Sequence, residues 1–354
     1  MCGSVTLTQI YTQLKDESVL KKEGHTKNGV WLLNAKLLIA KNSKITIDSN
    51  DTSWLKIVSD GRRANNILVY GSMKINSVKV TSWNPNTNNY DTNLGPKPRA
   101  FVRIMKEATG TTDITNSELA YLGYSPYTPP RAGVTSGLNY DGGNQSVLTN
   151  NNMHHLWAGI YTRGVSNIVI EKNNVHHNYH YGLDPHTGSN QITIRNNIVY
   201  DNGEEGIICS LDCYNIIMEN NEVYNNTQAG IMFSRNMSTS IARNNNIHDE
   251  TKGIFLSESH NNQVYNNTIS ESEDGIYLKS GSSNNTVYNN TIVHPKSNGI
   301  HINLGSSRNT FYSNMIIING NSTIQGVNVQ DKAASLDNIF KNNHLVKSKA
   351  LKMQ

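Results

Sequence analysis

The sequence has few of the residues that cross-link or charge a protein. Its three cysteines, Cys2, Cys209 and Cys213, offer no disulfide framework and no paired metal-binding spacing, so we expect buried thiols. Only 16% of the residues are charged, which argues against a disordered chain, where charge would dominate. No run of about 20 apolar residues exists, so we expect no membrane span. The net charge of +4 is compatible with an anionic ligand, and we expect no nucleic acid as partner.

The start of the chain also lacks an apolar leader. Residues 1–20 include Lys15, Asp16 and Glu17, where a signal peptide would need an apolar stretch. The sequence therefore either lost a leader or never had one, and no signal peptide is visible.

Apolar residues are scarce for a chain of this length. They make up 36% of the 354 residues, and Asn, Ser and Thr fill the deficit. An ordinary globular core would need more apolar side chains. A narrow core with short strands and many turns fits this composition better.

What the sequence does contain is a repeat of glycine followed by an apolar residue. The glycines are spaced by 22 to 24 residues, and the pairs are Gly159-Ile160, Gly182-Leu183, Gly206-Ile207, Gly230-Ile231, Gly253-Ile254, Gly275-Ile276 and Gly299-Ile300. Such a period indicates a repeat architecture. Asparagine pairs recur in phase with it, at residues 173–174, 196–197, 220–221, 244–245, 266–267 and 289–290.

Apolar and polar residues alternate within each repeat, as in Ile192-Thr193-Ile194. This is strand periodicity with one buried face. Asn and Gly suit the corners because both tolerate positive φ, and stacked Asn side chains can hydrogen-bond between coils. Helical repeats would show a period of 3.6, and leucine-rich repeats a regular Leu frame. The sequence therefore predicts an all-β fold, a right-handed parallel β-helix with coils of 22–24 residues.

We expect one β-helix domain over residues 1–354. An N-terminal cap would occupy 1–30, with a short amphipathic helix within 5–20. Early coils with long projecting loops would follow over 31–150, regular coils over 151–330, and a C-terminal cap or tail over 331–354. The loops are predicted from Pro-rich stretches between about 84 and 150, and long ordered loops are usually functional.

One coil breaks the repeat. Two residues after the glycine, Asp184 stands in a mostly bulky apolar column, whose members are Tyr161, Asp184, Ile208, Met232, Phe255, Tyr277 and His301. Pro185 then replaces a strand residue, although proline removes a ladder donor. Alternation puts Asp184 and His186 on one face, and Arg163 should lie beside His186, one coil away at about 4.8 Å.

The segment Tyr181-Gly182-Leu183-Asp184-Pro185-His186 closely resembles the Tyr-Gly-Phe/Ile-Asp-Pro-His segment of the mannuronan C-5 epimerases, which are right-handed β-helices. The specific motif covers six residues, and the architectural likeness covers about 150–330. The resemblance implies that Tyr181, Asp184 and His186 are catalytic. It also implies a secreted enzyme, extracellular or periplasmic, that acts on an anionic polyuronate.

C-5 epimerisation removes a proton α to a carboxylate and returns one to the opposite face. Arg163 is predicted to neutralise the carboxylate, because a guanidinium can hold it with two hydrogen bonds. His186 suits the role of general base or acid, and Tyr181 would exchange a proton from the other face. For substrate binding we expect Trp157, Tyr161, His180, Glu205 and Arg235 to line the groove. We expect a monomer and no required cofactor, although calcium could bind loop Asp and Asn side chains.

Three alternatives stay open. A polyuronate lyase would use the same proton abstraction and then expel the C-4 substituent. A glycoside hydrolase would need convergent carboxylates, which Asp184, Glu204 and Glu205 could supply. A non-catalytic carbohydrate-binding or structural β-helix would explain the repeats but not the unusual coil. The pairs His154-His155 and His176-His177, with His180, are predicted as corner residues rather than metal ligands.

Overall fold

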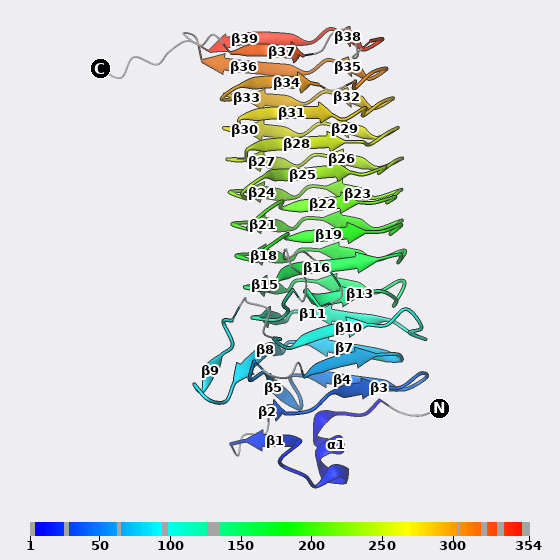
Figure 1. Ribbon diagram of the computed structural model, residues 1–354, viewed down its shortest axis with the longest axis vertical. Coiled ribbons are helices and arrows are strands. Elements are labelled where there is room, and N and C mark those ends of the chain that lie inside the picture. The colour runs from blue at the N-terminus through cyan, green and yellow to red at the C-terminus, as the bar shows by residue number, and fades with distance from the viewer. Residues whose placement is uncertain are drawn as a thin grey trace, which may run out of the picture. The chain divides into compact units, whose positions relative to one another are not determined.

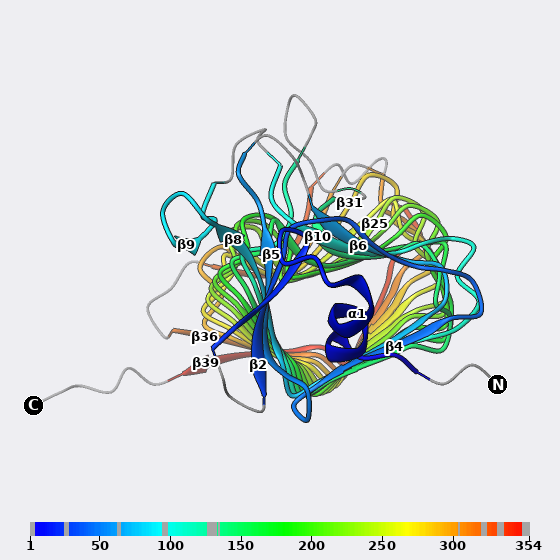
Figure 2. The same cartoon turned by 90° about the horizontal axis from the view of Figure 1, so that it is seen from below.

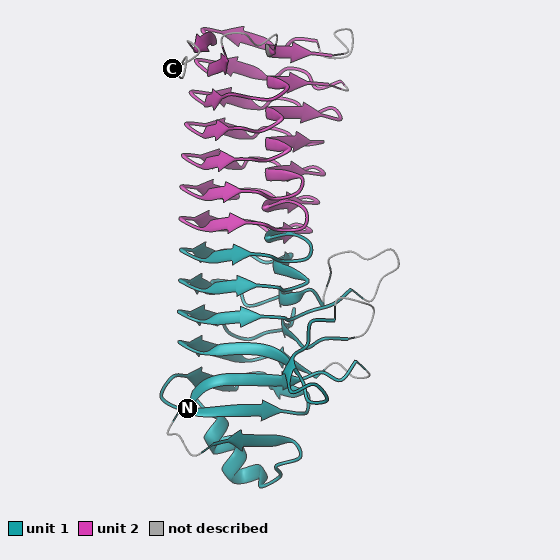
Figure 3. Cartoon of the chain, turned by 90° about the vertical axis from the view of Figure 1, so that its left-hand side faces the viewer, with its two compact units in different colours: residues 1–184 teal, residues 185–354 magenta. Residues whose placement is uncertain are grey.

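The chain folds as a right-handed parallel β-helix, as the repeat predicted. The computed structural model describes residues 4–24, 28–61, 65–93, 98–125, 133, 135–303, 305–319, 324–330 and 336–348. Two compact units divide the chain, residues 1–184 and 185–354, and Figure 3 colours them separately. Each coil contributes one strand to each of three sheets, here named A, B and C (Figure 1).

In unit 1 the parallel strands of each sheet follow one another at intervals of one coil, and the first two strands of sheet B pair antiparallel. Sheet B contains β1 (Leu20–Glu23), β2 (Gly29–Leu33), β5 (Thr52–Val58), β8 (Lys79–Asn84), β12 (Glu118–Ala120), β15 (Asn152–His154) and β18 (Asn174–His176), and β9 (Asn89–Tyr90) pairs with β8. Sheet C contains β3 (Leu37–Ile39), β6 (Asn66–Val69), β10 (Phe101–Ile104), β13 (Gly137–Tyr140), β16 (Ala158–Arg163) and β19 (Leu183–His186). Sheet A contains β4 (Lys44–Asp48), β7 (Ser72–Asn76), β11 (Thr112–Thr115), β14 (Val147–Thr149) and β17 (Val169–Glu171).

Unit 2 repeats this arrangement. Its part of sheet B contains β21 (Ile198–Tyr200), β24 (Glu222–Tyr224), β27 (Asn246–His248), β30 (Thr268–Ser270), β33 (Thr291–Val293), β36 (Met315–Asn319) and β39 (His344–Ser348). Sheet C continues as β22 (Ile207–Ser210), β25 (Ala229–Ser234), β28 (Lys252–Ser257), β31 (Asp274–Lys279), β34 (Asn298–Ile302) and β37 (Gln325–Val329). Sheet A continues as β20 (Thr193–Arg195), β23 (Ile217–Glu219), β26 (Ile241–Arg243), β29 (Gln263–Tyr265), β32 (Thr286–Tyr288), β35 (Thr310–Tyr312) and β38 (Ile339–Lys341).

The glycine columns predicted the register of sheet C correctly. In unit 2, Ile231 pairs with Ile254, and Ile254 with Ile276, so the isoleucines after the glycines form one buried column. The glycines themselves are needed where strands pack closely. A Cβ built on Gly253 would lie 2.3 Å from Ile269 Cγ2 and 2.6 Å from the carbonyl oxygen of Gly275, so any larger residue would force the coils apart.

The asparagine pairs serve two different purposes, both of which the sequence predicted. In the pairs from 196–197 onward the first member turns the corner, as Asn220 and Asn244 do with φ near 55°. The second is buried and bonds to its copy in the next coil. At 173–174 the buried member is Asn173, and Lys172 turns the corner. The Asn221 backbone N–H and Nδ2 both donate to Asn245 Oδ1 at 3.0 Å. This ladder satisfies the backbone of each corner, which the narrow core leaves buried.

The N-terminal helix also matches the prediction. Helix α1 (Leu7–Leu14) begins at Thr6, whose side chain forms a capping box with Gln9. Leu7 is fully buried, and the Tyr11 ring meets Trp31 edge-on at 5.6 Å. Figure 2 shows α1 lying across the first coil of unit 1. The helix therefore covers strand edges that would otherwise be open.

The stretch between 84 and 150 differs in part from the prediction of long loops. The β8–β9 hairpin departs from the regular coils, but β10 to β14 are ordinary strands of the solenoid. The predicted loops at residues 95–97 and 126–131 lie outside the described residues. The C-terminal stretch adds β38 and β39 as strands of a further coil, and the basic end beyond Ser348 is outside the described residues. No helix among the described residues is long and apolar enough to cross a membrane.

Candidate active site

Strand β19 carries the unusual motif. Asp184 is fully buried, and Pro185 lies within the strand. The division between the two units falls directly after Asp184, so the predicted site residues belong to two groups. Trp157, Tyr161, Arg163, His180, Tyr181 and Asp184 belong to unit 1. His186, Glu205 and Arg235 belong to unit 2.

Tyr181 is fixed by its backbone and by its neighbour. Its carbonyl oxygen accepts a hydrogen bond from Gly159 N at 2.9 Å, and the Gly182 oxygen accepts one from Ile160 N at 3.1 Å. The imidazole of His180 stacks on the phenol ring, with centroids 3.9 Å apart and an interplanar angle of 19°. The stacking leaves the Tyr181 ring little rotational freedom, which suits a side chain that must hold its hydroxyl in one place.

Arg163 ends strand β16 and binds a carboxylate within the protein. Its Nε and Nη2 donate to the two oxygens of Asp141 at 3.1 and 3.2 Å. Arg103 binds the same carboxylate from the other side, with Nε 2.7 Å from Oδ2. Asp141 is 5% exposed, whereas the Arg163 side chain keeps 43% of its surface exposed. Two guanidinium groups on one buried carboxylate leave a net positive charge on this face of sheet C.

The two aromatic residues predicted to bind substrate are too buried to stack on a sugar ring. Trp157 is 2% exposed and Tyr161 6%, so neither offers an open ring face. Tyr179 lies against Trp157, with centroids 4.5 Å apart, and is 52% exposed. Tyr179 was not predicted from the sequence. The corresponding residues in later coils are Gly203 and Thr227, so an aromatic residue at this corner was the available signal.

In unit 2, His186 is held between a hydroxyl and a guanidinium. Its Nδ1 contacts Thr187 Oγ1, and its Nε2 lies 3.2 Å from Arg235 Nη2. Arg235 is in turn bound to Ser210 Oγ, which its Nε approaches to 2.9 Å. Ser210 was not predicted as a site residue, although it stands in the same sequence column as His186.

The partners of His186 determine which ring nitrogen carries the proton. A guanidinium can only donate, so Nε2 accepts from Arg235, and Nδ1–H donates to Thr187. In this arrangement the Nε2 lone pair faces Arg235. Adding a proton to Nε2 beside Arg235 is costly while the guanidinium charge is uncompensated. An anionic ligand on Arg235 would remove that cost.

Glu205 is a buried carboxyl in the same unit. It is 5% exposed, and burial, helped by the nearby Glu204 charge, raises its pKa to about 7, although Lys252 and Arg235 act in the opposite direction. At neutral pH the group is therefore partly protonated and able to donate a hydrogen bond. The prediction that it contacts a substrate fits this chemistry and stays a prediction.

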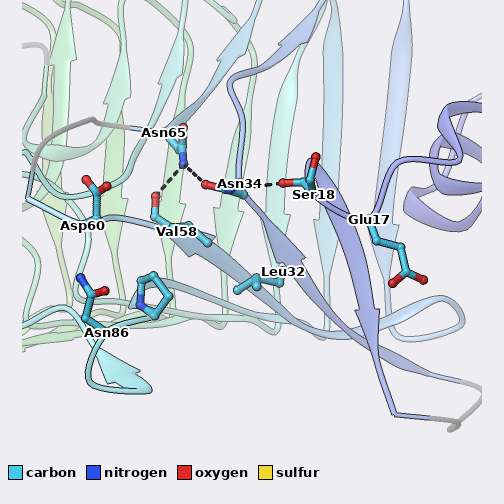
Figure 4. Close-up of a pocket in the computed structure, with 9 residues that line it drawn as sticks. Glu17, Ser18, Leu32, Asn34, Val58, Asp60, Asn65 and Asn86 are labelled. Carbon is cyan, nitrogen blue, oxygen red and sulfur yellow. Dashed lines mark hydrogen bonds between the residues drawn. The ribbon is translucent and has the colours of Figure 1, made fainter.

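A large cavity lies elsewhere in unit 1. It measures about 550 Å³ and is lined near α1 by Glu17, Ser18, Asn34, Asp60, Asn65 and neighbours (Figure 4). Asn65 Nδ2 donates to the carbonyl oxygen of Val58 at 2.9 Å and to Asn34 Oδ1 at 3.3 Å. Several of the residues that line this cavity thus already bond to one another, and its described lining includes none of the predicted site residues.

Comparison with known proteins agrees with the fold. The model of the family described as right handed beta helix region matches residues 28–213 and 208–345. A mannuronan C5-epimerase of Pseudomonas fluorescens is 28% identical over 176 residues, which cover 46% of this chain but only 31% of that protein. The relative is thus much longer than the stretch it shares with this chain.

Solved structures show the same architecture at low identity. The periplasmic alginate epimerase AlgG superposes with a TM-score of 0.85 at 21% identity, covering 98% of this chain and 84% of that one. The A-module of the Azotobacter vinelandii mannuronan C-5 epimerase AlgE6 gives 0.70 at 14%, covering 91% and 90%. The Dettilon tailspike protein gives 0.67 at 18%, covering 85% and 61%. Since proteins with different names share the fold, the fold alone does not assign an activity.

Proposed function

Because this chain belongs to the right-handed beta-helix family, we propose that it acts on an anionic polysaccharide as a C-5 epimerase, converting β-D-mannuronate residues of a polyuronate into α-L-guluronate. The observation that carries the proposal is the contact between His186 Nε2 and Arg235 Nη2, which lie 3.2 Å apart. The epimerase names of the partial relative and of two structural neighbours support the choice of reaction. An extracellular or periplasmic location and a monomeric state belong to the same proposal.

The first step is neutralisation of the substrate carboxylate. Its charge opposes removal of the C-5 proton, because the product would be a dianionic enolate. Arg235 is our choice for the neutralising group, since its guanidinium already lies against His186. Arg163, which the sequence favoured, is bound to Asp141 and would instead contribute long-range positive charge. Glu205, where protonated, can donate a hydrogen bond to the same carboxylate. The carboxyl oxygens of Asp184 are buried, and its predicted catalytic role stays a prediction.

The proton transfers use the two faces of the sugar ring. With the carboxylate on Arg235, His186 Nε2 can take the C-5 proton, because the imidazolium then faces a neutralised pair. The Tyr181 hydroxyl returns a proton to C-5 from the opposite face. One C5–H bond is thus broken and another formed, and the glycosidic bonds stay intact. Tyr181 regains its proton from solvent, and His186 releases the one it took.

A lyase is the alternative that the same contacts allow. His186 and Arg235 would form the same enolate, and the C-4 oxygen would then leave in place of reprotonation, giving an unsaturated uronate and a shorter chain. The remaining alternative is a binding or structural β-helix, which would leave every polyuronate unchanged.

The test is incubation with polymannuronate, and then other polyuronates, in deuterated water. Deuterium at C-5 with inverted configuration and no rise in absorbance at the unsaturated-uronate band is expected. Rising absorbance with chain shortening would identify a lyase, and no change on any polyuronate would contradict both enzymes.

Two variants connect the activity to the residues. Tyr181→Phe removes only a hydroxyl and His186→Ala removes the imidazole, and each should lower turnover by about 100-fold or more, the size of a general acid–base contribution. Folding is checked by circular dichroism and thermal unfolding. Full activity in both folded variants would refute the assignment.

A further inference from the structure

Four histidines form two pairs in successive coils of unit 1. His154 and His176 end strands β15 and β18, which are neighbours in sheet B (Figure 1), and His155 and His177 follow at the corner. The rings stack between coils, His154 on His176 with centroids 5.1 Å apart and His155 on His177 at 5.6 Å. Within each coil the two Nδ1 atoms are hydrogen-bonded to each other at 2.8 Å, so one of them carries a hydrogen that a bound metal would have to displace.

The corner position makes a bulky residue costly. His155 and His177 have φ of 56° and 53°, in the left-handed region that Asn and Gly tolerate best. In unit 2 the corner residues after β24 and β27 are Asn225 and Asp249, with φ of 54° and 57°. A strained conformation held by large side chains motivates a search for function.

The Nε2 atoms of His154 and His176 already form hydrogen bonds. His154 Nε2 lies 3.2 Å from Glu118 Oε1, and a carboxylate can only accept, so Nε2 carries a hydrogen. Lys79 Nζ binds the same Glu118 oxygen at 2.8 Å. With the hydrogen on Nε2, the Nδ1 atom of His154 faces Nδ1 of His155.

The second pair has the same arrangement. His176 Nε2 lies 3.0 Å from Asn152 Oδ1, which also accepts from Asn174 Nδ2. Nε2 therefore carries a hydrogen, and the Nδ1 atom of His176 faces Nδ1 of His177. In both coils, one histidine is oriented by a hydrogen bond from Nε2 in the way that metal-binding histidines usually are.

The spacing of the Nδ1 atoms favours one class of metal. Two nitrogens bound at right angles, about 2.0 Å from a metal, are about 2.8 Å apart, whereas tetrahedral ligands at that bond length are about 3.3 Å apart. Right-angled nitrogen ligands are typical of Cu²⁺ and Ni²⁺. Among the described residues no group of three or more His, Cys, Asp or Glu side chains is arranged for a metal, so each pair would supply two ligands and water the rest.

The pairs are accessible from solvent. His155 and His177 are exposed and line a cavity of about 300 Å³ with Tyr121, Leu156 and Tyr179. Buried Arg99 also lines it, and its guanidinium is bound to the carbonyl oxygens of Leu122, Gly123 and His155. The positive charge of Arg99 opposes an entering cation, so affinity must come from the nitrogen lone pairs.

We propose that His154–His155 and His176–His177 are two stacked bidentate sites for a divalent late transition metal that prefers right-angled coordination, with Cu²⁺ as the probe. Glu118 is a positioning residue that orients His154. The sites are separate from the proposed epimerase residues, and either proposal can fail without the other.

The test is titration of tag-free, chelator-treated protein with Cu²⁺, followed by electron paramagnetic resonance and calorimetry. The wild-type protein should give an axial signal with splitting from two nitrogens. The double variant His155→Asn/His177→Asn should lose this signal, and its fold should persist because Asn occupies the same corner at Asn225. Glu118→Gln should weaken binding by about 10–100-fold, the usual effect of changing an outer-shell partner.

The matched control is His248→Asn. His248 ends β27 in the same column as His154, but its Nδ1 faces a carboxylate, Asp249 Oδ2, at 2.8 Å. Its removal should leave the signal and the affinity unchanged. Equal Cu²⁺ binding by the folded double variant, loss of binding in His248→Asn, or a wild-type signal without nitrogen splitting would each overturn the proposal. Epimerase assays with and without chelator, run alongside, keep the two proposals distinguishable.

Discussion

At the scale of single residues, the two arginines of sheet C differ in what they already bind. Arg163 holds the carboxylate of Asp141, whereas Arg235 holds Ser210 and lies on His186. A guanidinium that is bound to a neutral hydroxyl can take up a substrate carboxylate without giving up an ion pair. The neutralising role should therefore fall mainly on Arg235.

Replacing each arginine by glutamine tests this difference. Arg235→Gln should lower kcat by about 100- to 1000-fold, the usual effect of losing one group that stabilises a developing oxyanion. Arg163→Gln should have a smaller effect, felt mainly in KM. Arg243→Gln is the control, because that arginine is paired with Glu219 at 2.6 Å on sheet A. A larger loss for Arg163→Gln than for Arg235→Gln would restore the assignment that the sequence favoured.

Glu250 is a second residue with an unusual environment. It is 3% exposed, and Asn226 Nδ2 donates to its Oε1 at 2.8 Å. Burial raises its pKa to about 8, against the hydrogen bond from Asn226, and the Asp249 and Glu205 charges add to the rise. An unfolded chain releases this proton near pH 4.3. The native state thus keeps a proton that the unfolded state loses, so stability should fall as pH rises from about 4 through about 8.

Glu250→Gln should flatten that dependence. Glutamine keeps an oxygen to accept from Asn226 and cannot ionise, so the variant should be more stable than the wild type at pH 8. Part of the pH dependence should remain in the variant, because the pKa of Glu205 is also raised. Urea unfolding between pH 5 and pH 8 measures the free energy of unfolding at each pH. The control is Glu222→Gln, which changes a 47% exposed side chain. Parallel curves for Glu250→Gln and wild type would show that Glu250 does not hold a proton.

At the scale of the coil, each asparagine of the ladder both accepts and donates several hydrogen bonds. Besides accepting two bonds from Asn221, Asn245 donates from Nδ2 to the Met218 oxygen at 3.0 Å and to Asn267 Oδ1 at 2.9 Å. All these groups are buried. One side chain thus satisfies polar groups in the coil on each side of it.

Asn245→Ala should therefore be far more destabilising than an ordinary polar substitution. Each buried group left without a partner costs about 1–3 kcal/mol, and this variant leaves several. The neighbouring Asn246→Ala, at an exposed position on β27, should stay within about 0.5 kcal/mol of wild type. Chemical denaturation of both compares them directly, and similar losses would mean that the ladder is not the main support of the corner.

The structure of a coil could be predicted from the sequence, whereas the side-chain contacts of the candidate site could be predicted only in part. Strand alternation, corner asparagines and the glycine period act locally, so they were enough to predict the sheets and the register of Ile231, Ile254 and Ile276. The contact of Arg235 with His186 depends on a corner residue with φ of 50° and on a long side chain, which column counting does not follow. The Asp141 partner of Arg163 was missed although it was within reach of column counting. Gly137-Leu138 continues the glycine period upstream of Gly159, and Asp141 stands in the same column as Arg163.

At the scale of the whole molecule, the free energy of unfolding should depend on contacts between adjacent coils. In a solenoid each coil contacts only the coils beside it, so the free energy of unfolding is close to a sum of local terms. Within unit 2, Asn197→Ala and Asn290→Ala change coils that share no ladder bond, and the double variant should be additive within about 0.5 kcal/mol.

The matched comparison is Asn245→Ala with Asn267→Ala. These side chains bond directly, so the two losses should overlap and the double variant should deviate from additivity by about 0.5–3 kcal/mol. Urea unfolding of the four single variants and the two double variants gives a double-mutant cycle for each pair. Strong coupling between the distant pair would imply cooperation through the core rather than through neighbouring coils.

The ladder has a consequence for how such a chain can change length over evolution. Every coil in it offers the same donors on one side and the same acceptors on the other, as Asn221, Asn245 and Asn267 do. Duplicating or deleting one complete coil would join equivalent bonding edges, whereas removing a few residues would misalign all three sheets. Relatives of this protein should accordingly differ in length by whole multiples of one coil, and the coil that carries Asp184 and His186 should be the one never lost.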